Sequence, residues 1–149
     1  MHSCHFVLLL LCCLLAGCSK EDPGRSDDLL IKAGFQCGWG AGTDSIVISR
    51  TSIKYTYYIP RESPLPKISK TRAVSASEWI EIQGCVNWLE FSKLDYNTCN
   101  ICVDGCDEWI SLEEGNTSRK ITFGKELAIE SISKLQTKLT GLRKEFSGK

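Results

Sequence analysis

Histidine is almost absent from this chain of 149 residues. The two histidines, His2 and His5, stand at its beginning, and none follows them. The rest of the chain therefore cannot build a Ser-His-Asp or Cys-His catalytic group, a histidine-ligated zinc site or an imidazole pH switch. Serines are plentiful, but no base is evident that would activate one. We expect no catalytic residues and no enzyme, and no bound cofactor.

An excess of positive charge is also missing. Lys and Arg total 18, Asp and Glu also total 18, and none of these charges precedes Lys20. Because binding to phosphate backbones needs a concentrated basic surface, this balance argues against nucleic acid as a partner. The adjacent Glu113 and Glu114 would point to opposite faces of a strand, so they cannot flank one scissile bond.

The apolar run near the N-terminus is too short to cross a membrane. Residues Phe6 to Leu15 form a run of ten, whereas a membrane-spanning helix needs about 20 apolar residues. A short apolar run at the N-terminus, followed by small residues, is typical of a secretory signal peptide. The next residues are Leu15-Ala16-Gly17-Cys18.

Leu15-Ala16-Gly17-Cys18 resembles the lipobox of bacterial lipoproteins. The resemblance implies that residues 1–17 are a cleaved signal peptide and that Cys18 becomes the lipidated first residue of a membrane-anchored protein. Several acyl chains, each contributing about 0.8 kcal/mol per buried CH₂, would make the anchor stable. Ser19 to Asp22, "SKED", is similar to the export tag of some Gram-negative surface lipoproteins, which favours display on the outer face of the outer membrane over a periplasmic orientation.

The remaining chain is expected to be a short tether and one domain. Residues 18–28 are polar and contain Pro23 and Gly24, which predicts a flexible tether after the lipidated cysteine. Residues 29–149 then form a single α+β domain. We predict a two-layer sandwich, an antiparallel sheet of 4–5 strands with two helices on one face, in the order β-hairpin, helix, β-hairpin, helix.

Hydrophobic periodicity supports this order. Alternating apolar and polar residues predict β-hairpins over residues 44–60 and 107–125. Apolar residues spaced by three and four positions predict two helices. The first runs from an N-cap at Ser77 to residue 94, with a stripe of Trp79, Ile82, Val86 and Leu89. The second is a C-terminal helix over residues 126–146. Glycines at 38, 40 and 42 indicate a turn or a bulged edge after residues 29–37. Residues 60–72, which contain three prolines, are expected to be an exposed loop.

The cysteines suggest disulfide bonds. Export would place the chain in an oxidising compartment, where disulfide bonds form and persist. Five cysteines follow Cys18, so we expect two bridges and one leftover thiol. The residue we expect to stay free is Cys85, as a small buried hydrophobe. The candidates for the two bridges are Cys37, Cys99, Cys102 and Cys106, with their pairing left open.

Two other uses of these cysteines are possible. Cys99-Asn100-Ile101-Cys102 has the spacing of a thiol-redox motif, but the nearby acidic residues would raise thiol pKa values. Four thiolates could also close a zinc site. Zinc sites usually pair two cysteine knuckles and only one cluster is present, so we expect no metal.

Aromatic residues provide the candidates for ligand binding. Trp39 and Trp109 could stack on a sugar or a peptide, or could cap the core. We therefore expect a lipid-anchored envelope protein with a non-catalytic binding or structural role. Its expected partners are the membrane, through the lipid, and an extracellular or periplasmic protein or glycan. The alternatives are a thiol-redox protein using Cys99 and Cys102, and a protease inhibitor that presents residues 60–72.

Overall fold

The computed structural model describes residues 28–38, 40, 42–63 and 65–148. The predicted signal peptide, the predicted lipidation site Cys18, the predicted tether up to residue 27 and Trp39 lie outside the described residues. Within the described part of the chain, no helix is both long enough and apolar enough to cross a bilayer.

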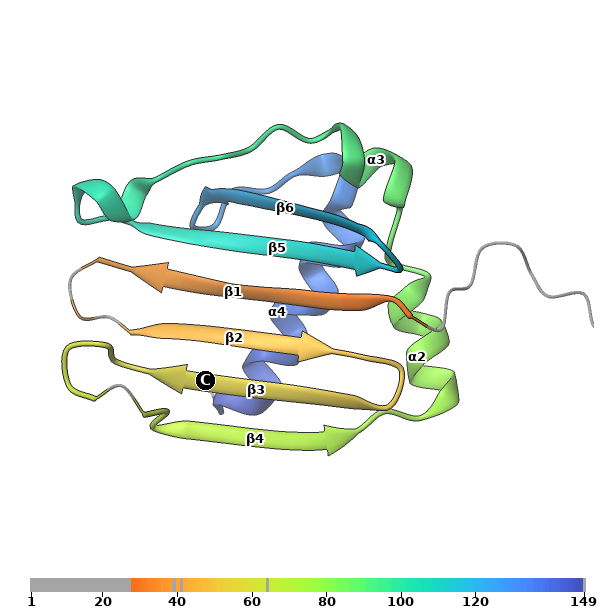
Figure 1. The fold of residues 1–149 in the computed structure, drawn as a ribbon, viewed down its shortest axis with the longest axis horizontal. Coiled ribbons are helices and arrows are strands. Elements are labelled where there is room, and N and C mark those ends of the chain that lie inside the picture. The colour runs from red at the N-terminus through yellow and green to blue at the C-terminus, as the bar shows by residue number, and fades with distance from the viewer. Residues whose placement is uncertain (1–27, 39, 41, 64, 149) are drawn as a thin grey trace, which may run out of the picture.

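The domain is built on one antiparallel sheet of six strands in the order β4-β3-β2-β1-β5-β6. Figure 1 shows the sheet face-on, with the long helix α4 lying behind it. The predicted α+β class is confirmed, but the sheet has six strands rather than four or five. The strands are β1 (Leu30–Cys37), β2 (Thr43–Ile48), β3 (Ser52–Tyr58), β4 (Ile68–Ala73), β5 (Cys106–Glu114) and β6 (Thr117–Gly124).

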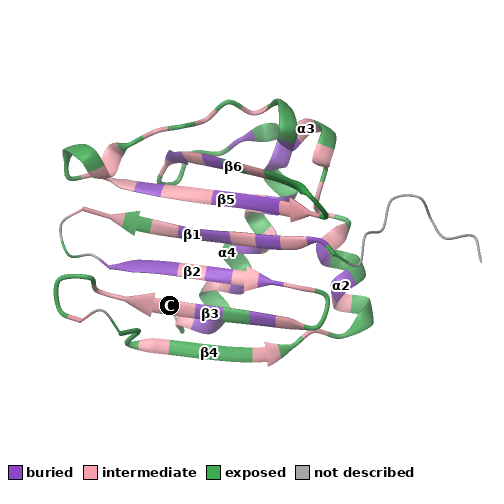
Figure 2. Ribbon diagram, viewed as in Figure 1, coloured by how far each residue is buried: buried purple, intermediate pink, exposed green. Residues whose placement is uncertain are grey.

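Two segments differ from the expected sheet. β1, after which the glycines predict a turn or a bulged edge, lies in the middle of the sheet, between β2 and β5, and is not an edge strand. Residues 68–72 were expected to belong to an exposed loop, but they form most of the edge strand β4. Figure 2 shows that β4 is largely exposed. Because an edge strand pairs on one side only and buries little, β4 has no apolar alternation that would reveal it.

The predicted helix of residues 77–94 is two short helices. α2 (Ala76–Gln83) begins at Ser75, whose side chain accepts a hydrogen bond from the backbone N–H of Glu78. α3 (Trp88–Lys93) begins after a second N-cap at Asn87. The break removes Leu89 from the expected stripe, and its side chain is 67% exposed. The observed order is therefore four strands, two short helices, a hairpin and α4 (Ser133–Ser147), with 3-10 turns η2 (Asn100–Val103) and η3 (Glu130–Ile132).

The core lies between α4 and one face of the sheet. The stripe predicted for the C-terminal helix is confirmed, because all its members are buried, although the helix begins only at Ser133: Ile129, Ile132, Leu135, Leu139, Leu142 and Phe146. Burial of this apolar surface is the main stabilising contribution. The strands supply Ile31, Ile46, Ile53, Ile110, Leu112 and Ile121 from the facing side. α2 and α3 pack at the end of the sheet where the described chain begins (Figure 1).

Gly34 allows an unusually close approach between β1 and β2. A Cβ at this position would lie 2.1 Å from the carbonyl oxygen of Asp44, a separation that no side chain can tolerate. The backbone N–H of Phe35, the register partner of Asp44, donates to Oδ1 of Asp44 at 3.0 Å. A carboxylate is thereby fixed on the sheet face that α4 covers.

Candidate functional site

Arg143 of α4 connects the buried carboxylate of Asp44 and the half-buried carboxylate of Glu108, which belong to different strands. Its Nε lies 3.2 Å from Oδ2 of Asp44, and its Nη2 lies 3.0 Å from Oδ1. Its Nη1 donates to Oε1 of Glu108 on β5, at 3.3 Å. The exposed fractions of the three side chains are 15% for Arg143, 5% for Asp44 and 21% for Glu108. Such partly dehydrated pairs interact more strongly than surface pairs.

The surroundings of Arg143 change the acidity of two neighbouring groups. Burial raises the pKa of the Asp44 carboxyl, although the positive charge of Arg143 opposes the shift. Burial and the nearby Asp44 carboxylate raise the pKa of Tyr55 to about 12. The Tyr55 hydroxyl donates to Oδ2 of Asp44 at 3.4 Å, and the guanidinium of Arg143 lies 5.3 Å from the centre of the Phe35 ring. Perturbed acidity of this kind is common at functional sites.

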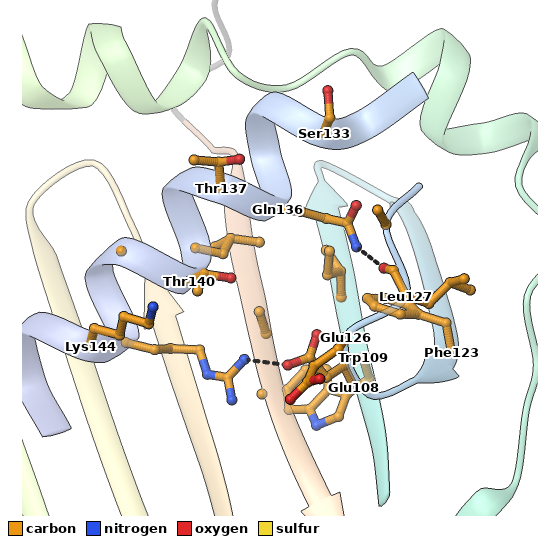
Figure 3. Close-up of a pocket in the computed structure, with 17 residues that line it drawn as sticks. Glu108, Trp109, Phe123, Glu126, Leu127, Ser133, Gln136, Thr137, Thr140 and Lys144 are labelled. Atoms are coloured by element: carbon orange, nitrogen blue, oxygen red, sulfur yellow. Dashed lines mark hydrogen bonds and ion pairs between the residues drawn. The ribbon is translucent and has the colours of Figure 1, made fainter. Parts of the chain in front are cut away.

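Two hollows adjoin Arg143, with volumes of about 470 Å³ and about 560 Å³. We call them together the Arg143 cleft, because both are lined by the same five residues: Glu108, Glu126, Thr140, Arg143 and Lys144. The first hollow lies between α4 and the β5–β6 hairpin and contains Phe123, Leu127 and Gln136 (Figure 3). The second hollow extends toward β3 and β4. Each volume is within the range of small-ligand sites.

The rotation of α4 determines which side chains face the cleft. The buried stripe fixes that rotation, so Gln136, Thr140, Arg143 and Ser147, at steps of four, three and four, lie along the flank beside it. Gln136 also holds the segment between β6 and α4. Its Nε2 donates to the carbonyl of Leu127 at 2.9 Å, and its Oε1 accepts from the N–H of Ile129 at 2.8 Å. One wall of the cleft is thereby fastened to the helix.

The structure describes one of the two tryptophan candidates, Trp109. Trp39 lies outside the described residues. Trp109 follows Glu108 on β5, so their side chains leave the strand on opposite faces. Trp109 lines the first hollow at the wall that β5 forms. The ammonium of Lys120 lies 4.9 Å from the centre of the Trp109 ring. One face of this indole therefore already has a partner within the chain.

The residues at the centre of the cleft were missed by the sequence analysis. Asp44 precedes Ile46 and Ile48 at period two, so an acidic residue stands where the strand pattern requires a core residue. A charge at a predicted core position is a signal of a buried ion pair or a site. Its partner could not be identified, because Arg143 is 99 residues away along the chain.

The disulfide prediction is confirmed in the structure. Cys37 is bonded to Cys106, its register partner on β5, and Cys99 is bonded to Cys102. Cys85 is the free cysteine of the described residues. The four cysteines considered for zinc are thus used in bridges, and no group of three His, Cys, Asp or Glu in the described ranges could hold a metal ion.

Asp107 holds the cysteine loop in place. Its carboxylate accepts hydrogen bonds from Oγ1 of Thr98 at 2.7 Å, Nδ2 of Asn100 at 2.8 Å and the N–H of Ile101 at 3.1 Å. Burial opposes its ionisation, but these hydrogen bonds outweigh burial and lower the pKa of Asp107. The loop is therefore fixed by a disulfide and by an ionised side chain, as expected for a stapled loop.

The sequence matches no protein family model and no curated protein sequence.

Proposed function

We propose that the chain is a lipid-anchored protein of the cell envelope, displayed at the outer membrane, and that its domain is a non-catalytic binding module. The Arg143 cleft is the ligand site in this proposal. The observation that supports it is a hollow of ligand size with charged and aromatic side chains around a half-buried arginine. A concave site with a few convergent polar groups and perturbed acidity is the usual setting for ligand binding.

The position of the cleft suits a tethered protein. Phe35 lies near the end of β1, Asp44 lies near the start of β2, and Glu108 lies near the start of β5, so the cleft lies toward one end of the sheet. The described chain begins at the other end, beside α2 (Figure 1). A lipid on Cys18 would therefore attach the domain at its α2 end, away from the cleft.

The arrangement of the carboxylates supports binding rather than catalysis. Asp44 and Glu108 both interact with one guanidinium, which holds their charges in place. General acid and base pairs instead need a carboxyl free to exchange a proton with a bound substrate.

Filling the cleft should abolish ligand capture. Thr140 is exposed on α4 and lines both hollows, so Thr140→Trp is expected to block the site with little change in melting temperature. The assay is capture of the full-length chain, exported so that its disulfides form and kept in a detergent without a sugar headgroup, on arrays of soluble glycans and peptides. We expect at least a tenfold loss of capture.

Thr117→Trp is the matched control for this experiment. Thr117 is also exposed but begins β6 at the turn after β5, at the opposite end of the strands. Its substitution should leave capture unchanged. Equal capture by Thr140→Trp and the parent chain would show that the cleft is not the binding site.

The thiol-redox alternative is favoured by one observation, the exposure of both Cys99 and Cys102. Rapid alkylation of this pair at neutral pH after mild reduction would support it, and resistance to alkylation without denaturant would exclude it. The inhibitor alternative loses much of its loop, because residues 68–72 are part of β4.

A further inference from the structure

We infer that β4 pairs with β4 of a second copy of this chain, as antiparallel strands centred on Thr71. The inference does not depend on the ligand of the Arg143 cleft. The two edges of the sheet differ within the described residues. The segment after α3 runs along β6, where the N–H of Thr122 donates to the carbonyl of Tyr96 and the N–H of Thr98 donates to the carbonyl of Thr122. No described segment lies beyond β4, so its outer edge is open (Figure 1).

One hydrogen bond shows which backbone groups of β4 point outward. The N–H of Val74 donates to the carbonyl of Thr51, at 3.1 Å, so the backbone groups of Val74 face β3. Successive residues of a strand direct these groups to opposite sides, so every second residue of β4 points away from β3. These residues are Ser69, Thr71 and Ala73. Within the described part of the chain, the one hydrogen bond to their outward groups is from Nη1 of Arg72 to the carbonyl of Ala73.

β4 lacks the features that usually protect an exposed strand edge. It contains no proline, and its register with β3 is continuous over all six residues, so no bulge twists it away. Its two charged side chains are held by the helices. Nζ of Lys70 donates to the carbonyl of Phe146 at 2.7 Å, and Arg72 binds the carboxylates of Glu78 and Glu145. An open edge of this kind is a template for another strand.

The sequence of β4 matches itself in one antiparallel register. Outward-pointing residues must lie opposite outward-pointing residues, so a two-fold axis can pass only through a residue and not between two. An axis at Thr71 sets Ser69 against Ala73 of the second copy and Thr71 against its own equivalent, and all of these side chains are small. An axis at Lys70 would set two lysines directly opposite each other, which is unfavourable. Axes at Ser69 or Arg72 would leave half of β4 without a partner strand.

The charges on the helix side of the sheet also match in this register. Lys70 comes to lie opposite Arg72 of the second copy. The carbonyl that Lys70 contacts does not neutralise its charge, whereas Arg72 is paired with two carboxylates, which leaves one excess negative charge in that group. The two-fold axis repeats this complementary pairing on both sides of Thr71, as a self-matching interface requires.

The first test measures self-association of the full-length chain, exported so that its disulfides form, by sedimentation velocity in density-matched detergent at several protein concentrations. We expect a monomer–dimer equilibrium. Thr71→Pro removes an outward N–H and no hydrogen bond to β3, so it should weaken the dimer at least tenfold and leave the domain folded. Thr71→Val, which keeps the N–H, is the matched control and should stay within threefold of the parent chain.

The second test fixes the register and does not depend on the proline variant. In Thr71→Cys the two substituted residues would face each other, with Cα atoms about 5.5 Å apart. In Ser69→Cys they would be separated by four positions, about 13 Å along the strands. With a short bis-methanethiosulfonate cross-linker, we expect at least tenfold more covalent dimer from Thr71→Cys than from Ser69→Cys. The parent chain, with its own cysteines, gives the background.

The outcomes separate this inference from the proposed ligand site. A monomer at every concentration, or equal cross-linking of Thr71→Cys and Ser69→Cys, would overturn the pairing of two copies. A monomer that captures array peptides, and loses them in Thr71→Pro, would also overturn it and assign the edge to another protein. Thr140→Trp lies in the cleft and should leave the dimer unchanged, so failure of ligand capture does not affect the test of β4.

Discussion

Gly34→Ala is expected to destabilise the domain by about 3 kcal/mol or more, among the largest effects of any single methyl group in the chain. The added Cβ would lie 2.1 Å from the carbonyl oxygen of Asp44, so the backbones of β1 and β2 must separate. Separation would also weaken the hydrogen bond from the N–H of Phe35 to the Asp44 carboxylate. Urea unfolding of the full-length chain, followed by circular dichroism, measures the loss.

The matched control is the same substitution in α4. Gly141 lies inside the helix and is exposed, and a methyl group added there would meet no atom within 4 Å beyond the backbone of its own helix. Alanine is favoured over glycine in helices by about 1 kcal/mol, so Gly141→Ala should raise the free energy of unfolding by about 0.5–1 kcal/mol. Equal, small effects of the two substitutions would contradict the close approach at Gly34.

Arg143→Met is expected to cost about 3–5 kcal/mol of stability at neutral pH, because it leaves the buried Asp44 carboxylate and the half-buried Glu108 carboxylate without their shared cationic partner. The methionine keeps much of the aliphatic packing of the side chain. Lys138→Met, on the same helix, is the control. It breaks an ion pair of 2.8 Å with the largely exposed Glu81 and should cost less than about 1 kcal/mol. Thermal and urea unfolding at pH 7 distinguish these results, and equal losses would contradict a special role for Arg143.

The loss caused by Arg143→Met should shrink as the pH falls. The pKa of Asp44 is raised in the folded protein, so the folded state binds more protons than the unfolded chain, and stability decreases as the pH rises through this interval. Arg143 opposes the rise in the pKa of Asp44, so removing Arg143 raises this pKa further in the folded protein. The decrease of stability with rising pH then becomes steeper. Stability measured from about pH 7 down to about pH 4 should therefore show the variant approaching the parent chain. A difference that is constant over this range would contradict the account.

The parts of the fold with regular apolar patterns could be predicted from the sequence. The C-terminal stripe from Ile129 to Phe146 is buried and the second hairpin is formed as expected, because the apolar residues of both face the core. β4 could not be predicted, since it is defined by pairing with β3 rather than by burial. The break between α2 and α3 depended on a second cap, Asn87, inside a continuous apolar stripe.

The site was harder to predict than the fold. Its central contact joins Asp44 to Arg143, and such a non-local pair becomes visible only when the helix is placed on the sheet. Sequence reasoning pointed to Trp39 and Trp109 because exposed aromatics are common in binding sites. The second hollow of the cleft is lined by Tyr57 instead, which shares one face of β3 with Ile53 and Tyr55.

The most direct test of the binding proposal is a two-dimensional NMR titration of the isotope-labelled full-length chain with the tightest ligand found on the glycan and peptide arrays. The account predicts shift changes that centre on the backbone amides of Asp44, Glu108, Thr140, Arg143 and Lys144. Changes centred on Lys120 and the sheet face away from α4, or no changes at saturating ligand, would contradict it.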